Sequence, residues 1–249
     1  MRRSQVGQAL VALIAVAVAA IASLSEPGHR LELAVGDVVS RVFSRTIESD
    51  VVIVAIDPKS LAEVGQWPWP RRLHAELLDR LAPSSPSSVF LDIDFSARSN
   101  AVDDAALERA LSEWSETPVI LPAFLQQWSS SDGSLALTEP LPGLRSHVSL
   151  ASVNLQPADD GLVRTVNTEW RNADGTLPTV AALLGRYQGG DTRVWIDYTV
   201  NPESFVAVSY SDVIANRIPA QYFAGKTVFV GATAIELGDI IPVPVYKSL

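Results

Sequence analysis

Residues 51–95 read VVIVAIDPKSLAEVGQWPWPRRLHAELLDRLAPSSPSSVFLDIDF, and this stretch decides the fold. The apolar run at 51–56 has no polar alternation, which is typical of a strand buried on both faces. A second apolar run starts at Val89, after a crossover of the length that parallel strands need. The order predicts a right-handed unit of strand, helix and strand, with the two strands as neighbours in one sheet.

Two helices are expected between these strands. Ser60 and Glu63 have the spacing of a capping box, and Gly65 can end the short helix that follows them. A longer helix should start near Pro70 and stop at Pro83. Its apolar face recurs at helical period, at Leu73, Leu77, Leu78 and Leu81.

The remaining chain alternates between strand and helix signals, without an internal repeat. We therefore expect one α/β domain, with a mixed, mostly parallel sheet flanked by helices and preceded by one transmembrane helix. The segment 126–147, rich in Ser, Gly and Pro, should be an exposed loop. Further helices are expected after a cap at Asp103 and at 178–187. Further strands are expected at 119–125, 147–156, 162–170 (antiparallel), 193–200, 206–210 and 227–231.

The N-terminus carries a membrane signal. Val6–Leu24 contains no charge over 19 residues, which is enough to cross a bilayer core of about 30 Å. Arg2 and Arg3 precede it, so residues 1–5 should stay in the cytoplasm and the later residues should emerge on the far side. The alternative is a cleaved signal peptide, because Ala20-Ile21-Ala22 offers a small-x-small site.

Residues 26–48 follow the membrane segment and should form a juxtamembrane helix, with residues 49–249 as the folded domain. The apolar positions of this segment make an uneven face at Leu31, Leu33, Val35, Val38, Val39, Val42 and Phe43. Such a face can pack on a partner subunit, as in a homodimer, or on the domain itself. Both readings stay open at this point.

Composition limits the function. Nineteen Lys and Arg against 28 Asp and Glu give a net charge of -9, which argues against a nucleic-acid partner. The chain has no cysteine and three scattered histidines, so it offers no thiolate or zinc site. We expect His74 to be half-buried or exposed. The segment AQYFAGKT at 220–227 lacks the first glycine of a Walker A loop, and no GxSxG or GxGxxG motif occurs, so no enzyme, metal or cofactor is predicted.

Candidate binding residues gather where strands of an open α/β sheet should end, which is where such sheets bind ligands. Each carboxylate has an alternative structural role as a cap or an ion-pair partner, and Asp57 before Pro58 can simply start a turn. The indoles beside Arg71 suit either a rigid platform at the mouth of a crevice or a packed corner. The candidates are Asp57, Trp67, Trp69, Arg71, Asp92, Asp94 and Asp239.

Several spaced motifs resemble one known family. IDPKSLAEVGQWPWPRRLHAELLDRL with FLDIDFS, DDGLVRTV at 159–166, FVAVSYSDVIA at 205–215 and AGKTVFVGATAIELGD at 224–239 together resemble the CHASE type 2 domain. The resemblance covers roughly residues 35–249 and implies an extracytoplasmic, periplasmic sensory domain of a bacterial inner-membrane receptor. It implies signal input without catalysis, with an unknown small molecule or periplasmic protein as ligand.

Proteins of this kind continue into a cyclase, a kinase or a GGDEF/EAL module, and the motif at 67–100 is most similar to versions that turn over cyclic-di-GMP. That output would lie beyond Leu249. Two alternatives come from other classes: a secreted periplasmic enzyme that uses the aspartate cluster, and a structural dimerisation module.

Overall fold

The structure is a computed structural model that describes residues 26–114, 116–127, 135–172, 175–238 and 240–245. The predicted transmembrane segment 6–24 and the candidate Asp239 lie outside these residues. Within the described ranges, no helix is both long and apolar enough to cross a membrane.

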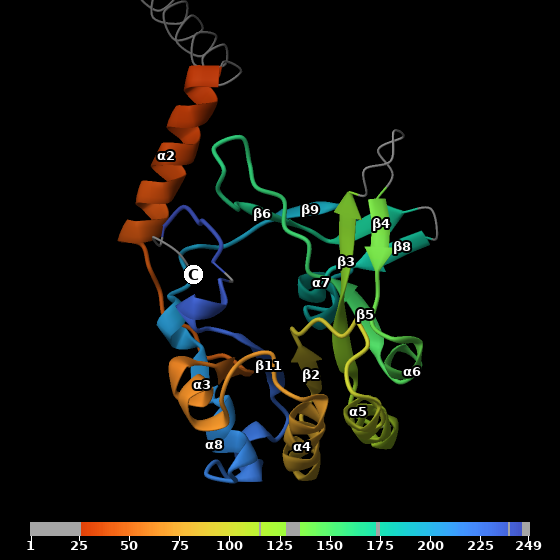
Figure 1. Cartoon of the computed structure of the whole chain (residues 1–249). Coiled ribbons are helices and arrows are strands. Elements are labelled where there is room, and N and C mark those ends of the chain that lie inside the picture. Colours follow the sequence, from red (N-terminus) through yellow and green to blue (C-terminus); the bar gives the residue numbers. More distant parts are fainter. Residues whose placement is uncertain (1–25, 115, 128–134, 173–174, 239, 246–249) are drawn as a thin grey trace, which may run out of the picture.

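A seven-stranded sheet forms the centre of the molecule (Figure 1). Its strand order is β10-β1-β11-β2-β3-β4, and β5 also pairs with β3. Every pairing is parallel except the one between β3 and β4. The strands are β1 (Val51–Ile56), β2 (Ser88–Leu91), β3 (Val119–Gln127), β4 (Leu135–Thr138), β5 (Ser149–Ser152), β10 (Val206–Ser209) and β11 (Thr227–Ala232).

Two small antiparallel ribbons lie outside this sheet. One pairs β6 (Thr165–Asn167) with β9 (Arg193–Trp195), and the other pairs β7 (Glu169–Asn172) with β8 (Gly175–Pro178). The α-helices are α2 (Glu26–Val42), α3 (Pro58–Val64), α4 (Arg71–Leu81), α5 (Ala101–Glu113), α6 (Pro142–Arg145), α7 (Val180–Leu184) and α8 (Tyr210–Ile214). Short 3-10 turns complete the fold at Ala82–Ser84, Pro202–Ser204, Ala220–Phe223 and Ile235–Leu237.

The predicted α/β class and the mixed, mostly parallel sheet are confirmed, but one neighbour relationship is wrong. β1 and β2 do not pair, because β11 lies between them, with Val51 opposite Thr227 on one side and Ser88 opposite Thr227 on the other. The crossover through α3 and α4 therefore skips one strand position. Local sequence could not show this, since the inserted strand comes more than 130 residues after β2 in the chain.

The antiparallel strand of the mixed sheet is not the predicted one at 162–170. Residues 165–172 form strands outside it, whereas the antiparallel strand β4 comes from the segment 126–147 that we expected to be a loop. β4 is only Leu135–Thr138, and the Ser, Gly and Pro residues around it hide its short apolar alternation. A further correction concerns α5, whose N-terminus is capped by Asn100 and not by Asp103.

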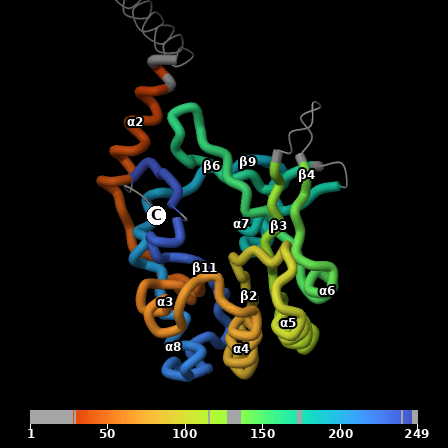
Figure 2. Tube along the Cα trace, viewed as in Figure 1, coloured from red at the N-terminus to blue at the C-terminus, as the bar shows by residue number. Residues whose placement is uncertain are grey.

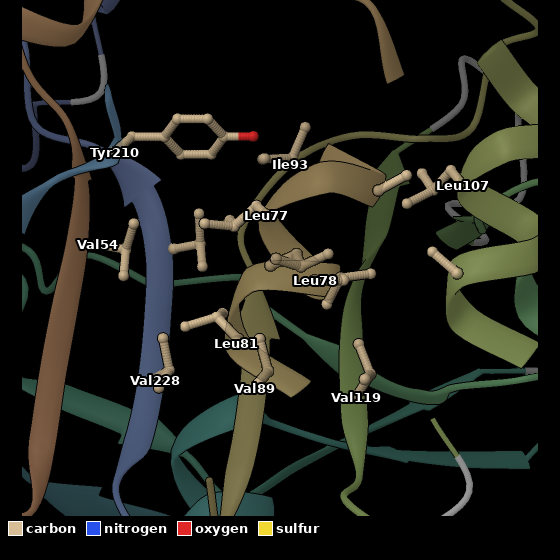
Figure 3. Packing of buried hydrophobic residues seen from close by; sticks show 14 of the residues in the cluster. Val54, Leu77, Leu78, Leu81, Val89, Ile93, Leu107, Val119, Tyr210 and Val228 are labelled. Carbon is tan, nitrogen blue, oxygen red and sulfur yellow. The ribbon is translucent and has the colours of Figure 1, made fainter. Parts of the chain in front are cut away.

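Both faces of the sheet are covered. Alternate residues of the strands, such as Val89 and Leu91, face the core under α4, α5 and α8, while Phe90 faces a smaller cluster against α7. The apolar face of α4 packs as predicted, with Leu77, Leu78 and Leu81 fully buried. Figure 3 shows these side chains between α4 and the strands, beside Val54, Val89, Ile93, Leu107, Val119, Tyr210 and Val228.

α2 stands at the margin of the domain. Figure 2 shows this first described helix alongside the chain's C-terminal segment, with its N-terminal end extending away from the body. Arg41 in its last turn donates from Nη2 to the Pro244 carbonyl oxygen at 2.9 Å. The helix predicted for 26–48 ends at Val42. The hydrogen bond from Arg41 to Pro244 joins this first described helix to the C-terminal segment.

Candidate functional site

A cavity of about 620 Å³ lies beyond the carboxyl ends of β1, β11 and β2, where a parallel sheet is expected to bind a ligand. Ile56, Ala232 and Asp92 mark these three strand ends at its base. The loop 67–71 and residues 97–99 form two further walls. Five of the predicted candidates line it together, namely Trp67, Trp69, Arg71, Asp92 and Asp94.

Asp92 and Asp94 are the exposed carboxylates of this cavity. They alternate with Ile93 and Phe95, which are buried, so the segment after β2 stays extended and directs its acids away from the core. The Asp92 N–H donates to the Val230 carbonyl, which holds the segment against β11. Asp94 accepts from the Ser96 N–H at 2.8 Å and so keeps its carboxylate at the cavity wall.

Trp67 and Trp69 form a packed corner. Their rings meet edge to face with centroids 5.3 Å apart, and the peptide bond between Trp67 and Pro68 is cis. Trp69 is buried, and its Nε1–H donates to the Gly65 carbonyl at 2.8 Å. Trp67 is only half-buried and lines the cavity, so it is the more accessible of the two indoles to a bound molecule.

Arg71 is already occupied by protein groups. Its side chain is 7% exposed, and Nη1 donates to Asp104 Oδ1 at 2.7 Å in the first turn of α5. Nη2 donates to the Ala97 carbonyl, and the guanidinium lies 5.3 Å from the centre of the Phe95 ring. Its carboxylate partner thus lies at the start of a helix and not at the end of a strand. Arg71 therefore fixes the cavity wall by joining α4 to α5.

His74 is buried, contrary to prediction, with 1% exposure. Burial and then the charge of Arg71 lower its pKa to about 4, so the imidazole is neutral. Its Nδ1 is 2.9 Å from the hydroxyl of Tyr210, which is also fully buried. With the Tyr210 hydroxyl as the donor of this bond, Nδ1 accepts and the proton of the neutral imidazole lies on Nε2.

His74 also lines the cavity, which makes it a site residue that sequence reasoning missed. The ring of Trp67 meets its edge with centroids 6.0 Å apart. A signal was available in the sequence, because position 74 precedes Leu77 and Leu78 by three and four residues and so falls on the apolar face of α4.

Asp57 has a structural role and is not among the residues that line the cavity. It is the N-cap of α3, accepting at Oδ1 from the Ser60 N–H at 2.7 Å, so the predicted capping box starting at Ser60 is wrong. Its other carboxylate oxygen accepts from the Ser209 hydroxyl. Burial favours the protonated form, but these hydrogen bonds outweigh it and lower the pKa of Asp57.

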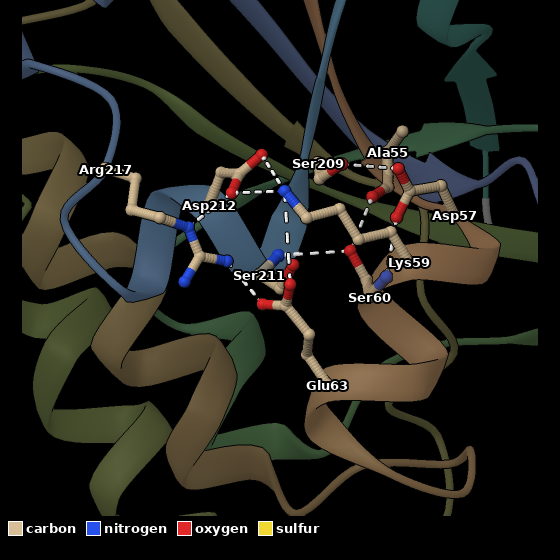
Figure 4. Close-up of polar contacts among 9 residues, drawn as sticks. All are labelled: Ala55, Asp57, Lys59, Ser60, Glu63, Ser209, Ser211, Asp212 and Arg217. Atoms are coloured by element: carbon tan, nitrogen blue, oxygen red, sulfur yellow. Dashed lines mark hydrogen bonds and ion pairs between the residues drawn. The ribbon is translucent and has the colours of Figure 1, made fainter.

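Around Asp57, polar contacts hold α3 to α8 (Figure 4). The buried Ser60 hydroxyl accepts from the Ser211 N–H at 3.1 Å. Lys59 and Arg217 both bind the carboxylate of Asp212, and these contacts lower its pKa. This face of the sheet edge is therefore a structural junction, beside the cavity but separate from it.

A chain of contacts leads from the cavity to α2. Ala232 and Leu237 line the cavity, and the segment that follows places the Pro242 carbonyl 3.0 Å from the Val163 N–H. Pro244 then accepts from Arg41 of α2.

A second link to α2 comes from the residue after Val163. The buried Arg164 donates from Nη2 to Asp37 Oδ2 of α2 at 3.0 Å and to Asp160 Oδ2 at 2.8 Å. Hydrogen bonds from its guanidinium to Asp37, opposed by burial, raise the pKa of Arg164, which stays charged. The charged motif at 159–166 therefore anchors the helix.

Among the described residues, no group of three or more His, Asp or Glu side chains is arranged to hold a metal ion. The buried carboxylates beside the cavity are engaged by arginines, Asp103 by Arg72 and Asp104 by Arg71.

Comparison with known proteins gives one match. The CHASE2 domain family matches residues 11–248, which is nearly the whole chain. No curated protein and no solved structure matches. The matched range includes the stretch at 51–95, which supplies most of the cavity lining, and the motif at 159–166, which anchors α2. The chain therefore belongs to the CHASE2 family, the extracytoplasmic sensory domains of membrane proteins.

Proposed function

We propose that this chain is the input part of a transmembrane signalling receptor, and that the cavity beyond β1, β11 and β2 is its sensing site. The observation that carries the proposal is the meeting of Trp67, His74, Asp92 and Asp94 around one open volume of about 620 Å³. Such a volume is within the range of sites for small molecules.

The ligand is a small molecule with an amino group or a similar donor. The carboxylate of Asp94 is exposed at the wall, whereas the charges of Arg71 and Asp103 are met by protein partners. The Trp67 ring offers its face to a cation or a flat apolar group. His74 offers one donor, Nε2–H, to an acceptor elsewhere on the ligand.

Occupancy reaches the membrane side through α2. A ligand in the cavity contacts the segment that carries Ala232 and Leu237, and this segment continues to Pro244, which binds Arg41. Arg164 and Asp37 provide the second connection. A shift of the segment on binding would therefore change the contacts that hold α2.

Titration of the full chain with primary alkylamines and, separately, with alkyl carboxylates tests the site. We expect a saturable change in intrinsic tryptophan fluorescence with amines only. Asp94→Asn should abolish it, because Asn keeps the oxygen that accepts from Ser96 but loses the charge. Asp79→Asn, an exposed aspartate on α4, is the matched control and should bind normally. Equal responses of the two variants, or a response to carboxylates alone, would contradict the proposed ligand class.

The sequence supports the remaining part of the proposal, which is the arrangement of the receptor. In this arrangement, residues 1–5 lie in the cytoplasm and residues 6–24 anchor the chain in the inner membrane. Residues 26–48 connect the anchor to the periplasmic sensory domain at 49–249. The output is cyclic-di-GMP turnover through GGDEF and EAL modules. Fusion of alkaline phosphatase at about residue 60 should be active in cells, and a mature chain starting near Ser23 would contradict the anchor. The sequence after Leu249 identifies the output directly.

A catalytic alternative would use the aspartates around the cavity in acid-base chemistry. Of the predicted aspartate cluster, Asp57 is engaged as the N-cap of α3 and lies outside the cavity lining, which speaks against acid-base chemistry by that cluster. A sensory role therefore fits the site better.

A further inference from the structure

α2 presents an apolar stripe that no described residue covers. Leu31 is 66% exposed, Val35 54%, Val38 56% and Val42 69%. These residues follow one another at intervals of four, three and four, which is the spacing of a heptad seam. Isolated exposed apolar residues are common, but an aligned row along a helix marks an interaction surface.

The opposite side of α2 faces the domain. Between Leu31 and Val42, the less exposed positions are Leu33, Asp37 and Ser40, and Asp37 is held by Arg164. At about 100° per residue, these three positions point about 180° away from the row of exposed residues. The fold thus fixes the rotation of α2 and directs the apolar row away from the body.

A second copy of this chain fits the row better than an unrelated partner. In the heptad register, the row places Val35 and Val42 at a and Leu31 and Val38 at d, and β-branched residues at a favour two-stranded coils. A seam of this kind is self-complementary. The uncharged segment 6–24 just before α2 is expected to give every copy the same orientation, so the two helices would run parallel.

We propose that two copies of the chain pair through Leu31, Val35, Val38 and Val42 as a parallel two-helix coil, with the sensory domains held on its outside by Arg164. Each helix then has a domain bound on one side and its partner on the other. This proposal concerns a different surface from the ligand cavity, so either can fail without the other.

Cysteine scanning tests it, because the natural chain contains no cysteine. Val35→Cys and Val38→Cys are introduced singly into the full chain in native membranes, and the samples are oxidised and separated without reductant. Gly36→Cys is the matched control, since Gly36 is exposed, has open space around it and lies one residue from the seam. Disulfides require Cα atoms within about 7 Å, so only seam positions of facing helices should react.

We expect strong dimer bands for the two seam variants and a several-fold weaker band for Gly36→Cys. Co-expression of two differently tagged copies should give a mixed dimer. As a second readout, Val35→Glu with Val38→Glu should convert the detergent-solubilised chain to a monomer in light scattering, with an unchanged circular dichroism spectrum. Equal cross-linking at 35, 36 and 38, absence of cross-linking, or cross-links only to other proteins or lipid would overturn the proposal.

Discussion

The guanidinium of Arg164 is held by the carboxylate of Asp37, a residue 127 positions earlier in the chain. Arg164 is 8% exposed as a side chain and Asp37 20%, so water screens this pair only partly. The pair joins the middle of α2 to the domain.

Asp37→Asn should therefore loosen α2 without unfolding the domain. We expect the local stability of α2 to fall by about 2 kcal/mol, the scale of a hydrogen bond to a charged group. Amide hydrogen exchange of residues 33–41 should speed up accordingly, while exchange in β1 and β11 stays unchanged. Glu32→Gln, an exposed change on the same helix, should leave both unaffected. A global loss of protection in Asp37→Asn would contradict this view.

Arg71→Ala should destabilise the domain by about 3–5 kcal/mol, because it leaves the Asp104 carboxylate without its buried partner. The neighbouring Arg72→Ala is the control. Its side chain is 62% exposed and its contact with Asp103 is 3.3 Å long, so removal should cost less than about 1 kcal/mol. Urea unfolding of both variants measures the difference, and equal midpoints would show that Arg71 does not support the wall.

The pair of His74 and Tyr210 predicts a pH dependence. The pKa of His74 is 6.5 in an ordinary environment and about 4 in the fold. Between these pH values, His74 is protonated in the unfolded chain and neutral in the folded chain. The free energy of unfolding should fall by about 3 kcal/mol as the pH drops from 6.5 to 4. Above pH 6.5 His74 is neutral in both states, so the full stability is present there.

The measurement compares urea unfolding of the natural chain with that of His74→Leu combined with Tyr210→Phe, from pH 7.5 to pH 4. The double variant removes both polar partners together, so it leaves neither unpaired. It should show a shallower loss of stability toward acid pH. Parallel curves for the two proteins would show that His74 is not kept neutral by the fold.

Asp57→Ala should cost about 0.5–2 kcal/mol, the usual effect of losing an N-cap side chain. Because Asp57 does not line the cavity, amine binding should be unchanged once the variant is folded. Fluorescence titration beside a thermal melt separates the two effects. Loss of amine binding with a normal melting temperature would show that Asp57 belongs to the binding site.

Leu77→Ala should cost about 2–5 kcal/mol, since Leu77 is fully buried under the sheet and its removal leaves a cavity. Glu76→Ala is the neighbouring control. Its contact with Arg80 is an exposed pair across one helical turn, worth less than about 0.5 kcal/mol. Equal unfolding midpoints would mean that α4 is rotated relative to the sheet.

Periodicity predicted the local elements well because it depends on a few neighbouring residues. The leucines of α4 are buried as their spacing indicates, and the acids after β2 alternate with core residues. His74 was missed because chemical type was weighed above its position on the same helical face. The partner of Arg71 was also missed, since Asp104 comes from α5, 33 residues later.

Local patterns could not predict the strand order, because strands that pair are far apart in the sequence. The apolar run at 227–232 has the composition of any central strand, and nothing near it shows which strands it joins. Its insertion places β1 and β2 two positions apart, so Asp57 and Asp92 do not follow neighbouring strands as predicted.

The central position of β11 also sets the order in which the domain can assemble. β1 and β2 are synthesised early, yet each has an open edge until Thr227–Ala232 arrives. The growing chain must hold these apolar strands apart from wrong partners until residues 227–232 have been made. Folding then depends on contacts between distant parts of the chain, so it should be slow and cooperative. The sheet therefore cannot close from its first strands alone, because the strand that joins β1 to β2 comes more than 130 residues after β2.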